Sequence, residues 1–232
     1  MNSKLIVEYS GQLGLDIDGH KAELMAEYGR LLLEKNKDVN LTAVTDEREF
    51  IVKHLCDSLT VATQKEVAGE VADVGTGGGF PGVVIKILRP ELSLTLIDSV
   101  QKKLAAVAGI CDELGIVVET VHGRAEELGA KECRDRFDTV TARALARMPR
   151  LLEYCLPLVK KDGFLLAMKG PLAEEEIKAA RRAAELLRGT LIRTQSFDLP
   201  DGIKRTVVVY KKTGPTPKEF PRTSKRINVE PV

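Results

Sequence analysis

The sequence predicts an α/β fold: a mainly parallel seven-stranded sheet, covered by helices on both faces, with an antiparallel edge hairpin and an N-terminal helical addition. Three observations lead to this expectation. Short apolar strands alternate with helices through the middle of the chain, which is the pattern of a parallel sheet. A glycine-rich loop follows the first strand and opens a helix. The last two strands follow one another with only a short connection, which favours an antiparallel hairpin.

The elements follow this pattern in order. Residues 1–66 form a helical region, since apolar residues recur at helical spacing over 18–36 and again after Asp46. Beyond it, strands are expected at 70–75, 94–98, 117–123, 139–143, 164–170, 191–198 and 205–212. The intervening helices are expected at 81–88, 102–114, 149–160 and 173–187. The last of these helices has acids at its start and bases near its end, as the helix dipole favours.

Length and composition restrict the class of protein. A chain of 232 residues with 44% hydrophobic content can bury one good core, so we expect one globular unit and a monomer. The four cysteines lie far apart without a zinc-like spacing, so we expect structural thiols and no metal site. The N-terminus lacks a signal-peptide pattern, and no apolar run approaches the roughly 18 residues that span a bilayer. We therefore expect a cytoplasmic protein without a membrane contact.

Positive charge gathers at the end of the chain. From Ile203 to Arg226, eight basic residues accompany one acid, a local balance of +7 in a chain whose net charge is +1. The segment 213–232 is rich in Pro, Gly, Thr and Lys and is expected to be extended or disordered in isolation. This end is either a surface for phosphate backbones or a solvated tail. The candidate phosphate ligands are Arg124, Lys211, Lys212, Arg222 and Arg226.

The loop 73–82 is the first candidate for ligand binding. It reads Asp-Val-Gly-Thr-Gly-Gly-Gly-Phe-Pro-Gly between a strand and a helix. Glycine suits such a tight turn because it adopts positive φ and lets the backbone press against a ligand, so Gly75 and Gly77 are expected to face a cofactor. The loop also satisfies the weak dinucleotide pattern G-x-G-x-x-G, which keeps NAD as an alternative.

Three features favour S-adenosylmethionine over NAD. Asp73 opens the D-x-G-x-G-x-G order of methyltransferases, in which this carboxylate lies near the ammonium end of the cofactor. The edge hairpin is usual in methyltransferases and not in dehydrogenases. Asp98 ends the next strand, where it can accept both ribose hydroxyls, although NAD enzymes share this feature and Asp98 could instead cap a helix. Ala125 and Glu126 follow the third strand, where the adenine is expected, with helix capping as the other role for Glu126.

Seven motifs occur together in a known order. They are Asn40-Leu41-Thr42, His54-Leu55-Cys56-Asp57-Ser58-Leu59, the loop 73–82, Leu96-Ile97-Asp98-Ser99, Arg124-Ala125-Glu126, Phe137-Asp138 to Arg143-Ala144, and Lys169-Gly170. Over about residues 36–170 the chain thereby resembles the bacterial 16S ribosomal RNA guanine-N7 methyltransferases, historically called glucose-inhibited division protein B. The resemblance implies a Rossmann-like class I methyltransferase that acts with S-adenosylmethionine on a guanine of the small ribosomal subunit. It also implies cofactor contacts by Gly75, Phe80, Ala125, Glu126 and Arg143.

The chemistry of guanine N7 determines which residues to seek. N7 is an unprotonated acceptor, so it attacks a methyl group without losing a proton and needs no general base. The enzyme has to supply alignment, which can contribute ~7 to 11 kcal/mol. The positioning candidates are the polar motif residues Asn40, His54, Asp57 and Lys169. Their structural alternatives are helix stabilisation by His54 and Asp57, a turn at Asn40, and a solvated Lys169.

Other methyl acceptors fit the sequence less well. The stretch after the fourth strand lacks the N/D-P-P-Y/F turn of amino-group methyltransferases. Cys155 lies in an apolar run and is expected to be a core residue and not the nucleophile of a pyrimidine methyltransferase. The expected domains are a helical region (1–66), a methyltransferase domain (67–212) and a basic tail (213–232). An NAD-dependent oxidoreductase and a non-catalytic nucleotide-binding regulatory module are the competing functions.

Overall fold

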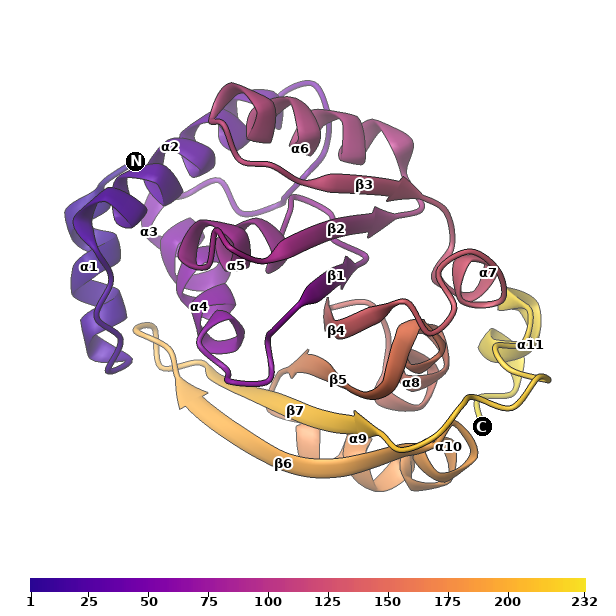
Figure 1. The fold of residues 1–232 in the computed structure, drawn as a ribbon. Helices are drawn as coiled ribbons and strands as arrows, with labels where there is room; N and C mark the ends of the chain where they lie inside the picture. Colours follow the sequence, from indigo (N-terminus) through magenta and orange to yellow (C-terminus); the bar gives the residue numbers. More distant parts are fainter.

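A seven-stranded sheet forms the centre of the computed structural model, which describes residues 1–232 (Figure 1). The strand order is β3-β2-β1-β4-β5-β7-β6, with β1 to β5 parallel and β7 antiparallel to both β5 and β6. The strands are β1 (Glu70–Val74), β2 (Ser93–Asp98), β3 (Glu119–His122), β4 (Phe137–Arg143), β5 (Val159–Lys169), β6 (Gly189–Asp198) and β7 (Lys204–Lys212). The predicted mainly parallel sheet with an antiparallel edge hairpin is confirmed.

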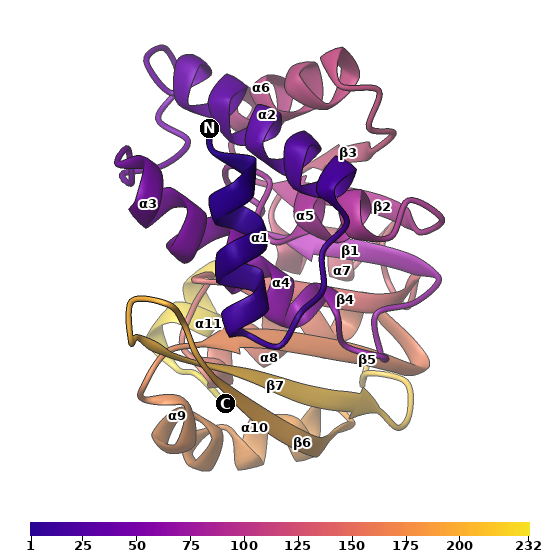
Figure 2. The same cartoon turned by 90° about the vertical axis from the view of Figure 1, so that its left-hand side faces the viewer.

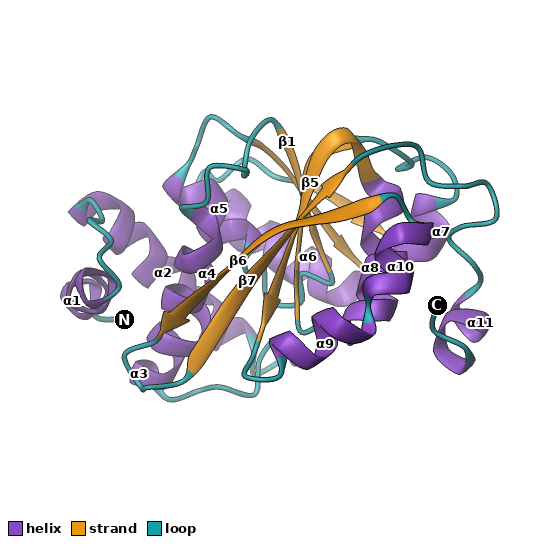
Figure 3. Cartoon of the chain, turned by 90° about the horizontal axis from the view of Figure 1, so that it is seen from below, coloured by secondary structure: helices purple, strands orange, loops and turns teal.

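Helices cover both faces of this sheet (Figure 3). The first face carries α1 (Ser3–Gln12), α2 (Gly19–Lys35), α3 (Glu47–Phe50), a π-helical stretch (Ile51–Cys56), α4 (Asp57–Ala62), α5 (Gly82–Leu88) and α6 (Gln101–Glu113). The second carries α7 (Ala125–Gly129), α8 (Met148–Cys155), a 3-10 turn (Leu156–Leu158), α9 (Ala173–Ala179), α10 (Arg181–Leu186) and α11 (Ser224–Val229). None of these helices combines the length and the apolar character that crossing a membrane requires.

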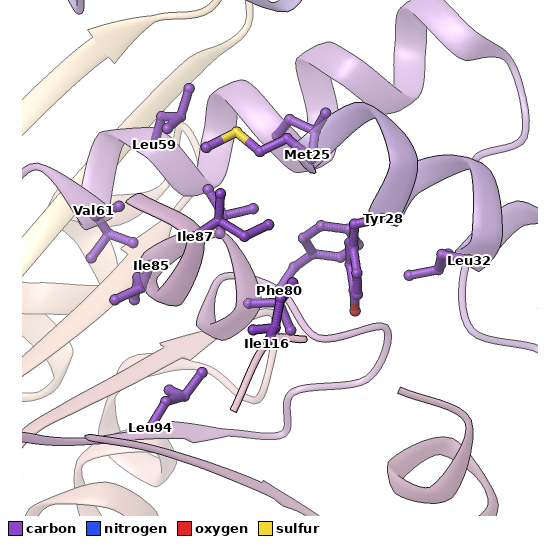
Figure 4. Packing of buried hydrophobic residues seen from close by; sticks show 14 of the residues in the cluster. Met25, Tyr28, Leu32, Leu59, Val61, Phe80, Ile85, Ile87, Leu94 and Ile116 are labelled. Carbon is purple, nitrogen blue, oxygen red and sulfur yellow. The ribbon is translucent and has the colours of Figure 1, made fainter. Parts of the chain in front are cut away.

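The N-terminal helices share the main hydrophobic core with the sheet. Figure 2 shows α1 beside α2, and α1 also packs against the π-helical stretch. Tyr28 of α2 and Phe80 of the glycine loop meet edge to face, with ring centroids 5.8 Å apart (Figure 4). Both belong to the same buried cluster as Ile85 of α5 and Leu94 of β2. The N-terminal helices therefore pack against the glycine loop through this shared core.

Two helices differ from their predicted extents. The helix expected over 149–160 ends at Cys155, because Pro157 has no N–H to continue the hydrogen-bond ladder, and β5 already begins at Val159. The helix expected over 173–187 is divided at Ala180 into α9 and α10. Ala180 and Ala183 are fully buried near α8, so the bend keeps small side chains against the core where the chain turns toward β6.

The C-terminal segment 213–232 packs on the body of the folded protein; the expectation that it is extended or disordered in isolation stays a prediction. The guanidinium group of Arg134 donates hydrogen bonds to the carbonyls of Thr216 (2.6 Å), Pro217 (3.3 Å) and Phe220 (2.8 Å). Ile227 is fully buried on α11, which packs against α8. These partners are distant in the sequence, and composition alone does not reveal them.

Candidate active site

The glycine loop leaves β1 at the carboxyl edge of the sheet. Gly75, Gly77 and Gly79 have φ values of 70°, 56° and 82°, in the left-handed region where a side chain is strained. A Cβ at Gly79 would also collide with the hydroxyl of Tyr28. That hydroxyl is buried and donates a 2.8 Å hydrogen bond to the carbonyl of Gly78. Glycine is thus needed here both for the turn and for the close approach of α2.

Asp73 holds the loop in this shape from inside the protein. Its carboxylate accepts hydrogen bonds from the Thr76 hydroxyl (2.7 Å), the Gly82 amide (2.9 Å) and the Thr141 hydroxyl (3.2 Å). Burial raises the pKa of Asp73, and these donors oppose that shift. The residue is fully buried, so a ligand has no surface on which to reach it. Asp73 therefore shapes the loop from below the surface, and its predicted place near the ammonium end of the cofactor stays a prediction.

A cavity of about 210 Å³ lies beside the loop, where β1 and β2 end. We call it the glycine-loop cavity. Apolar atoms of Val74, Ile97 and Leu145 line it together with Tyr154. It also brings together five of the predicted site residues, namely Gly75, Asp98, Arg124, Ala125 and Glu126. A cleft of mixed polar and apolar lining, with a backbone cradle and a few acidic acceptors, fits a nucleoside such as the adenosine of S-adenosylmethionine.

Asp98 connects the loop to this cavity. Its Oδ2 accepts a 2.9 Å hydrogen bond from the amide of Gly77, and its Oδ1 accepts one of the same length from the amide of Val100. Asp98 thus holds both the glycine loop and the residue that precedes α6, but it does not cap that helix, whose N-cap Val100 has no side-chain partner for its first turn. A carboxylate has about four acceptor sites, so both oxygens of Asp98 can still accept a further hydrogen bond from a ligand in the cavity.

Glu126 is buried at the rim of the same cavity. Its carboxylate accepts a hydrogen bond from the hydroxyl of Ser224, the first residue of α11. The C-terminal segment therefore contributes to the cofactor side of the molecule through a contact that the sequence did not reveal.

A second, larger cavity of about 560 Å³ lies between the ends of β4 and β5 and the π-helical stretch. We call it the basic cavity. Its cationic side chains are Lys53, Arg143, Arg147, Lys169 and Arg205. Its carboxylates are Asp57 and Glu176. The excess of cations fits a polyanionic substrate.

The loop after β4 borders both cavities. Ala144 and Ala146 line the basic cavity, whereas Leu145 between them lines the glycine-loop cavity. Leu145 lies against Gly75 so closely that a Cβ there would be 2.7 Å from its Cδ1. Two ligand sites therefore adjoin at the carboxyl edge of the sheet, where open α/β folds bind their ligands.

His54, Asp57 and Arg143 form one hydrogen-bond network in the basic cavity. Arg143 donates from Nη2 to His54 Nδ1 (3.0 Å) and from Nη1 to Asp57 Oδ2 (3.2 Å) and the carbonyl of Lys53 (2.9 Å). Because arginine only donates, His54 carries its proton on Nε2, which lies 2.7 Å from the hydroxyl oxygen of Thr42. Burial, and next the charge of Arg143, lower the pKa of His54 to about 3, so the ring is neutral.

The helix that carries this network differs from the predicted one. His54 lies on a π-helical stretch, a rare conformation that occurs often at functional sites, and Arg143 of β4 bridges it to Asp57.

The His54 ring stacks on Phe80, with centroids 4.8 Å apart, and the Arg143 guanidinium lies 5.4 Å from the centre of the same Phe80 ring. Neither Phe80 nor Arg143 lines the glycine-loop cavity, and their predicted contact with the cofactor stays a prediction. Phe80 instead supports the residues of the basic cavity.

Asp57 has one carboxylate oxygen without a hydrogen bond. Its Oδ1 is buried and lies 3.5 Å from the Nε of Arg205, which makes an ion pair without hydrogen-bond geometry. Burial raises the pKa of Asp57, although Arg143 and Arg205 lower it. Arg205 on β7 was not among the predicted site residues.

Lys169 lines the basic cavity as predicted, but it is paired and not solvated. Its Nζ donates to the carbonyl of Ala146 (2.6 Å) and to Oε2 of Glu176 (2.8 Å). The same oxygen of Glu176 accepts a 2.8 Å hydrogen bond from the amide of Met148. The sequence placed Glu176 only among the acids that favour a helix start, and so missed its position in the site.

Asn40 is exposed and lines neither cavity. The neighbouring Asn36 instead organises this turn: its Oδ1 accepts from the amides of Leu41 (2.7 Å) and Thr42 (2.9 Å). Its Nδ2 donates to the carbonyl of Thr42 (3.0 Å), the residue whose hydroxyl meets His54. Asn36 thus organises the turn before Thr42, and the positioning role of Asn40 stays a prediction.

Two of the predicted phosphate ligands make internal ion pairs. Lys212 is fully buried, and its Nζ donates to Asp135 Oδ1 (3.1 Å) and to the carbonyls of Leu156 (2.7 Å) and Val159 (3.1 Å). Arg222, the second of them, forms a two-point ion pair with the carboxylate of Glu153, which is itself fully buried. Lys212 is therefore not accessible to phosphate in this structure, whereas the role of Arg222 on phosphate stays a prediction. Sequence periodicity does not reveal either internal partner.

The other candidates stay available to a partner. Lys211 is half-buried and pairs with Asp162 at 3.0 Å, an ion pair near the surface that phosphate can displace. Arg124 and Arg226 are exposed. Their role on phosphate remains a prediction.

Sequence relatives agree on one family. The chain matches the GidB family, described as rRNA small subunit methyltransferase G, over residues 21–206. It is 42% identical to the ribosomal RNA small subunit methyltransferase G of Lactobacillus acidophilus, over 94% of this chain and 97% of that protein. It is 40% identical to the protein of the same name from Leuconostoc citreum, over 100% of both chains.

Solved structures share the fold. The O-methyltransferase TomG of Streptomyces achromogenes, in complex with SAM, matches with a TM-score of 0.56 and 18% identity, over 91% of this chain and 96% of that one. An O-methyltransferase from Bacillus cereus, in complex with SAH, matches with a TM-score of 0.57 and 15% identity, over 89% and 97%. The sheet and its covering helices are thus those of a Rossmann-like class I methyltransferase.

Proposed function

This chain belongs to the GidB family of rRNA small subunit methyltransferases, and we propose that it transfers a methyl group to N7 of one guanine in 16S ribosomal RNA. It is a methyltransferase that uses S-adenosylmethionine and acts on ribosomal RNA of the small subunit. The glycine pattern therefore belongs to a methyltransferase loop and not to an NAD site. Membership in this methyltransferase family also argues against the two competing functions, an NAD-dependent oxidoreductase and a non-catalytic regulatory module.

The residues of the glycine-loop cavity fit the cofactor. The Gly75 backbone would cradle it, Asp98 would accept the ribose hydroxyls, and Ala125 and Glu126 would border the adenine. When bound, S-adenosylmethionine supplies a methyl group on a sulfonium, which a neutral nucleophile can attack. The loop after β4 borders both cavities, with Leu145 on the side of the cofactor and Ala144 and Ala146 on the side of the basic cavity.

One observation favours a ring nitrogen as the acceptor: the only imidazole of the basic cavity has no free nitrogen. His54 accepts from Arg143 at Nδ1 and donates toward Thr42 at Nε2, and its pKa is lowered to about 3. It therefore cannot take a proton from an amine or a hydroxyl near neutral pH. N7 of guanine has no proton to lose, so the site can act by alignment and electrostatics alone.

The experiment uses the lability of N7-methylguanine. Small subunits that lack the modification are incubated with the enzyme and S-adenosylmethionine, and their RNA is treated with borohydride and then aniline. We expect strand cleavage at one guanine, and none with enzyme that carries Asp98→Ala under limiting cofactor. Nucleoside mass spectrometry that places the methyl on an exocyclic amine, a ribose oxygen or a pyrimidine would overturn the N7 assignment.

Several finer points belong to the same proposal. We expect the enzyme to act in the cytoplasm, as a monomer, with the small subunit or its RNA as the partner. The division into a helical region (1–66), a methyltransferase domain (67–212) and a basic C-terminal segment (213–232) is supported by the sequence pattern. The shared core means that the first two of these form one folding unit.

A further inference from the structure

Glu176 is held in place by one oxygen and presents the other to the basic cavity. Its Oε2 accepts two hydrogen bonds of 2.8 Å, from the amide of Met148 and from Nζ of Lys169. Its Oε1 takes part in no hydrogen bond and is not among the buried unpaired atoms, so it is accessible. The side chain as a whole is only 15% exposed. A carboxylate oxygen is thus fixed in direction inside a cavity otherwise dominated by cations.

Lys169 presents a complementary donor beside it. An ammonium group has three N–H donors, and Nζ of Lys169 uses two of them, on Ala146 and Glu176. The residue ends β5 and is 8% exposed, so its direction is also fixed by packing. One N–H therefore remains for a ligand, next to the free oxygen of Glu176.

This pair matches one nucleobase better than the others. The Watson–Crick edge of guanine carries an acceptor, O6, followed by two donors, N1–H and the N2 amino group. Adenine and cytosine place an unprotonated ring nitrogen where guanine has N1–H, and a carboxylate would repel it. Uracil presents O4, N3–H and O2, so it has a second acceptor where guanine has the donor of its N2 amino group. Enzymes that modify a base commonly read this edge after the base leaves its stack.

We propose that Glu176 and Lys169 select guanine, with the Glu176 carboxylate accepting from N1–H and the N2 amino group and the Lys169 ammonium donating to O6. The inference rests on the proposed function and names two specificity-determining residues of that reaction. N7 lies on the opposite edge of the base from N1 and N2, so a base held in this way leaves the acceptor of the methyl group unobstructed.

The simpler role for the pair is a structural tie between the end of β5 and α9. An ion pair of this kind contributes little net stability when its desolvation is included, so stability alone does not account for its position in a ligand cavity. A structural tie would affect all substrates alike, whereas a specificity role depends on the N2 amino group of the base. This difference decides the design of the test.

The test replaces Glu176 by glutamine. In Glu176→Gln the amide oxygen must stay on Met148 N and Lys169 Nζ, because both are donors, so the NH₂ group faces the cavity in place of an acceptor. The matched control is Glu175→Gln, the exposed neighbour on the same helix. Reconstituted small subunits carry guanosine or inosine, which lacks the N2 amino group, at the methylated position.

Wild-type enzyme and Glu175→Gln are expected to prefer guanosine to inosine by about 10- to 100-fold in kcat/KM, the scale of a hydrogen bond to a charged group. Glu176→Gln should lose activity on guanosine by a similar factor and show a guanosine-to-inosine ratio near one, with unchanged affinity for S-adenosylmethionine. An unchanged ratio in Glu176→Gln would overturn the proposal. So would equal wild-type activity on both bases, a result that needs no variant to fold. If wild-type enzyme methylates neither, the proposed function itself fails.

Discussion

Asp98 is the residue on which cofactor affinity should depend most. Replacing it with alanine removes the acceptor for the ribose and also frees the amides of Gly77 and Val100, which would loosen the loop. We expect the affinity for S-adenosylmethionine to fall by ~1.5 to 3 kcal/mol, the scale of hydrogen bonds to a charged group. Isothermal titration calorimetry measures the change. Asp112→Ala, an exposed carboxylate on α6, is the control; an unchanged affinity in folded Asp98→Ala would remove Asp98 from the site.

His54 should make folding stability depend on pH in a predictable direction. Its pKa is about 3 in the folded protein, against 6.5 for an unperturbed histidine. Between these values the unfolded chain binds a proton that the folded protein does not, so this contribution to stability is full above pH 6.5 and is lost as the pH falls toward 3. The protonation of this one residue changes the free energy of unfolding by at most about 1.4 kcal/mol per pH unit.

A variant isolates this contribution from that of other groups. Glutamine at position 54 offers an acceptor to Arg143 and a donor to Thr42 but does not titrate near neutral pH. We expect the free energy of unfolding of the wild type to fall relative to that of His54→Gln as the pH is lowered from about 6.5 to about 5, measured by urea unfolding. A difference that stays constant over this range would show that His54 is protonated in the folded protein.

For individual residues, a place in the site was predictable from the sequence where it follows from a position at the end of a strand. Asp98, Ala125 and Glu126 follow strand ends, and in a parallel sheet those ends meet at one edge, so their shared cavity was predictable. The placement of Lys212 and Arg222 was not, because each depends on a buried partner that is distant in the sequence. The same holds for Glu176 and Arg205, which reach the basic cavity from α9 and β7.

The C-terminal segment should contribute strongly to stability through one ion pair. Arg222 is the partner of Glu153, a fully buried carboxylate of α8. Alanine at position 222 would leave this charge unpaired, which is expected to cost about 3 to 5 kcal/mol in the free energy of unfolding. Chemical denaturation tests this value. Arg226→Ala, which removes an exposed cation of the same segment, should change the stability by less than about 0.5 kcal/mol.

The outcome also distinguishes the two roles considered for Arg222. If Arg222→Ala unfolds at the same denaturant concentration as the wild type, the ion pair is not formed in solution and the arginine is free for RNA. A large loss of stability would instead confirm that the ion pair between Arg222 and Glu153 holds the C-terminal segment against α8.

Elements were predictable where local signals determine their ends. The glycine loop precedes α5, and Pro157 ends the helical run after α8, so these boundaries follow from backbone chemistry. The division between α9 and α10 at Ala180 has no such signal, since alanine is the strongest helix former and only packing against α8 accounts for the bend. The π-helical stretch is equally hidden, because its periodicity differs little from that of an ordinary helix.

The whole molecule combines a nearly neutral charge with a local concentration of cations. The net charge of +1 gives no general attraction to RNA. Positive side chains instead gather around the basic cavity, and some of the terminal cations are occupied by internal partners. The surface for phosphate is therefore expected around the cavity mouth as much as along the C-terminal segment. This arrangement would bring the RNA to the side of the β4 loop opposite the cofactor.

The salt dependence of RNA binding tests this distribution of charge. Lys53 and Arg147 line the basic cavity; Arg147 is exposed, and Lys53 is half-buried beside Glu49. Replacing both with alanine should weaken binding to small subunits and release fewer counterions. The slope of log K against log salt should become shallower by about 0.7 to 0.9 for each phosphate that the variant no longer neutralises. Arg182→Ala on α10, an exposed residue that lines neither cavity, should leave the slope unchanged. Affinity for S-adenosylmethionine should also stay constant in every variant, since none lines the glycine-loop cavity. If Arg226→Ala flattens the slope while Lys53→Ala with Arg147→Ala does not, the RNA approaches along α11 and the basic cavity receives only the target base.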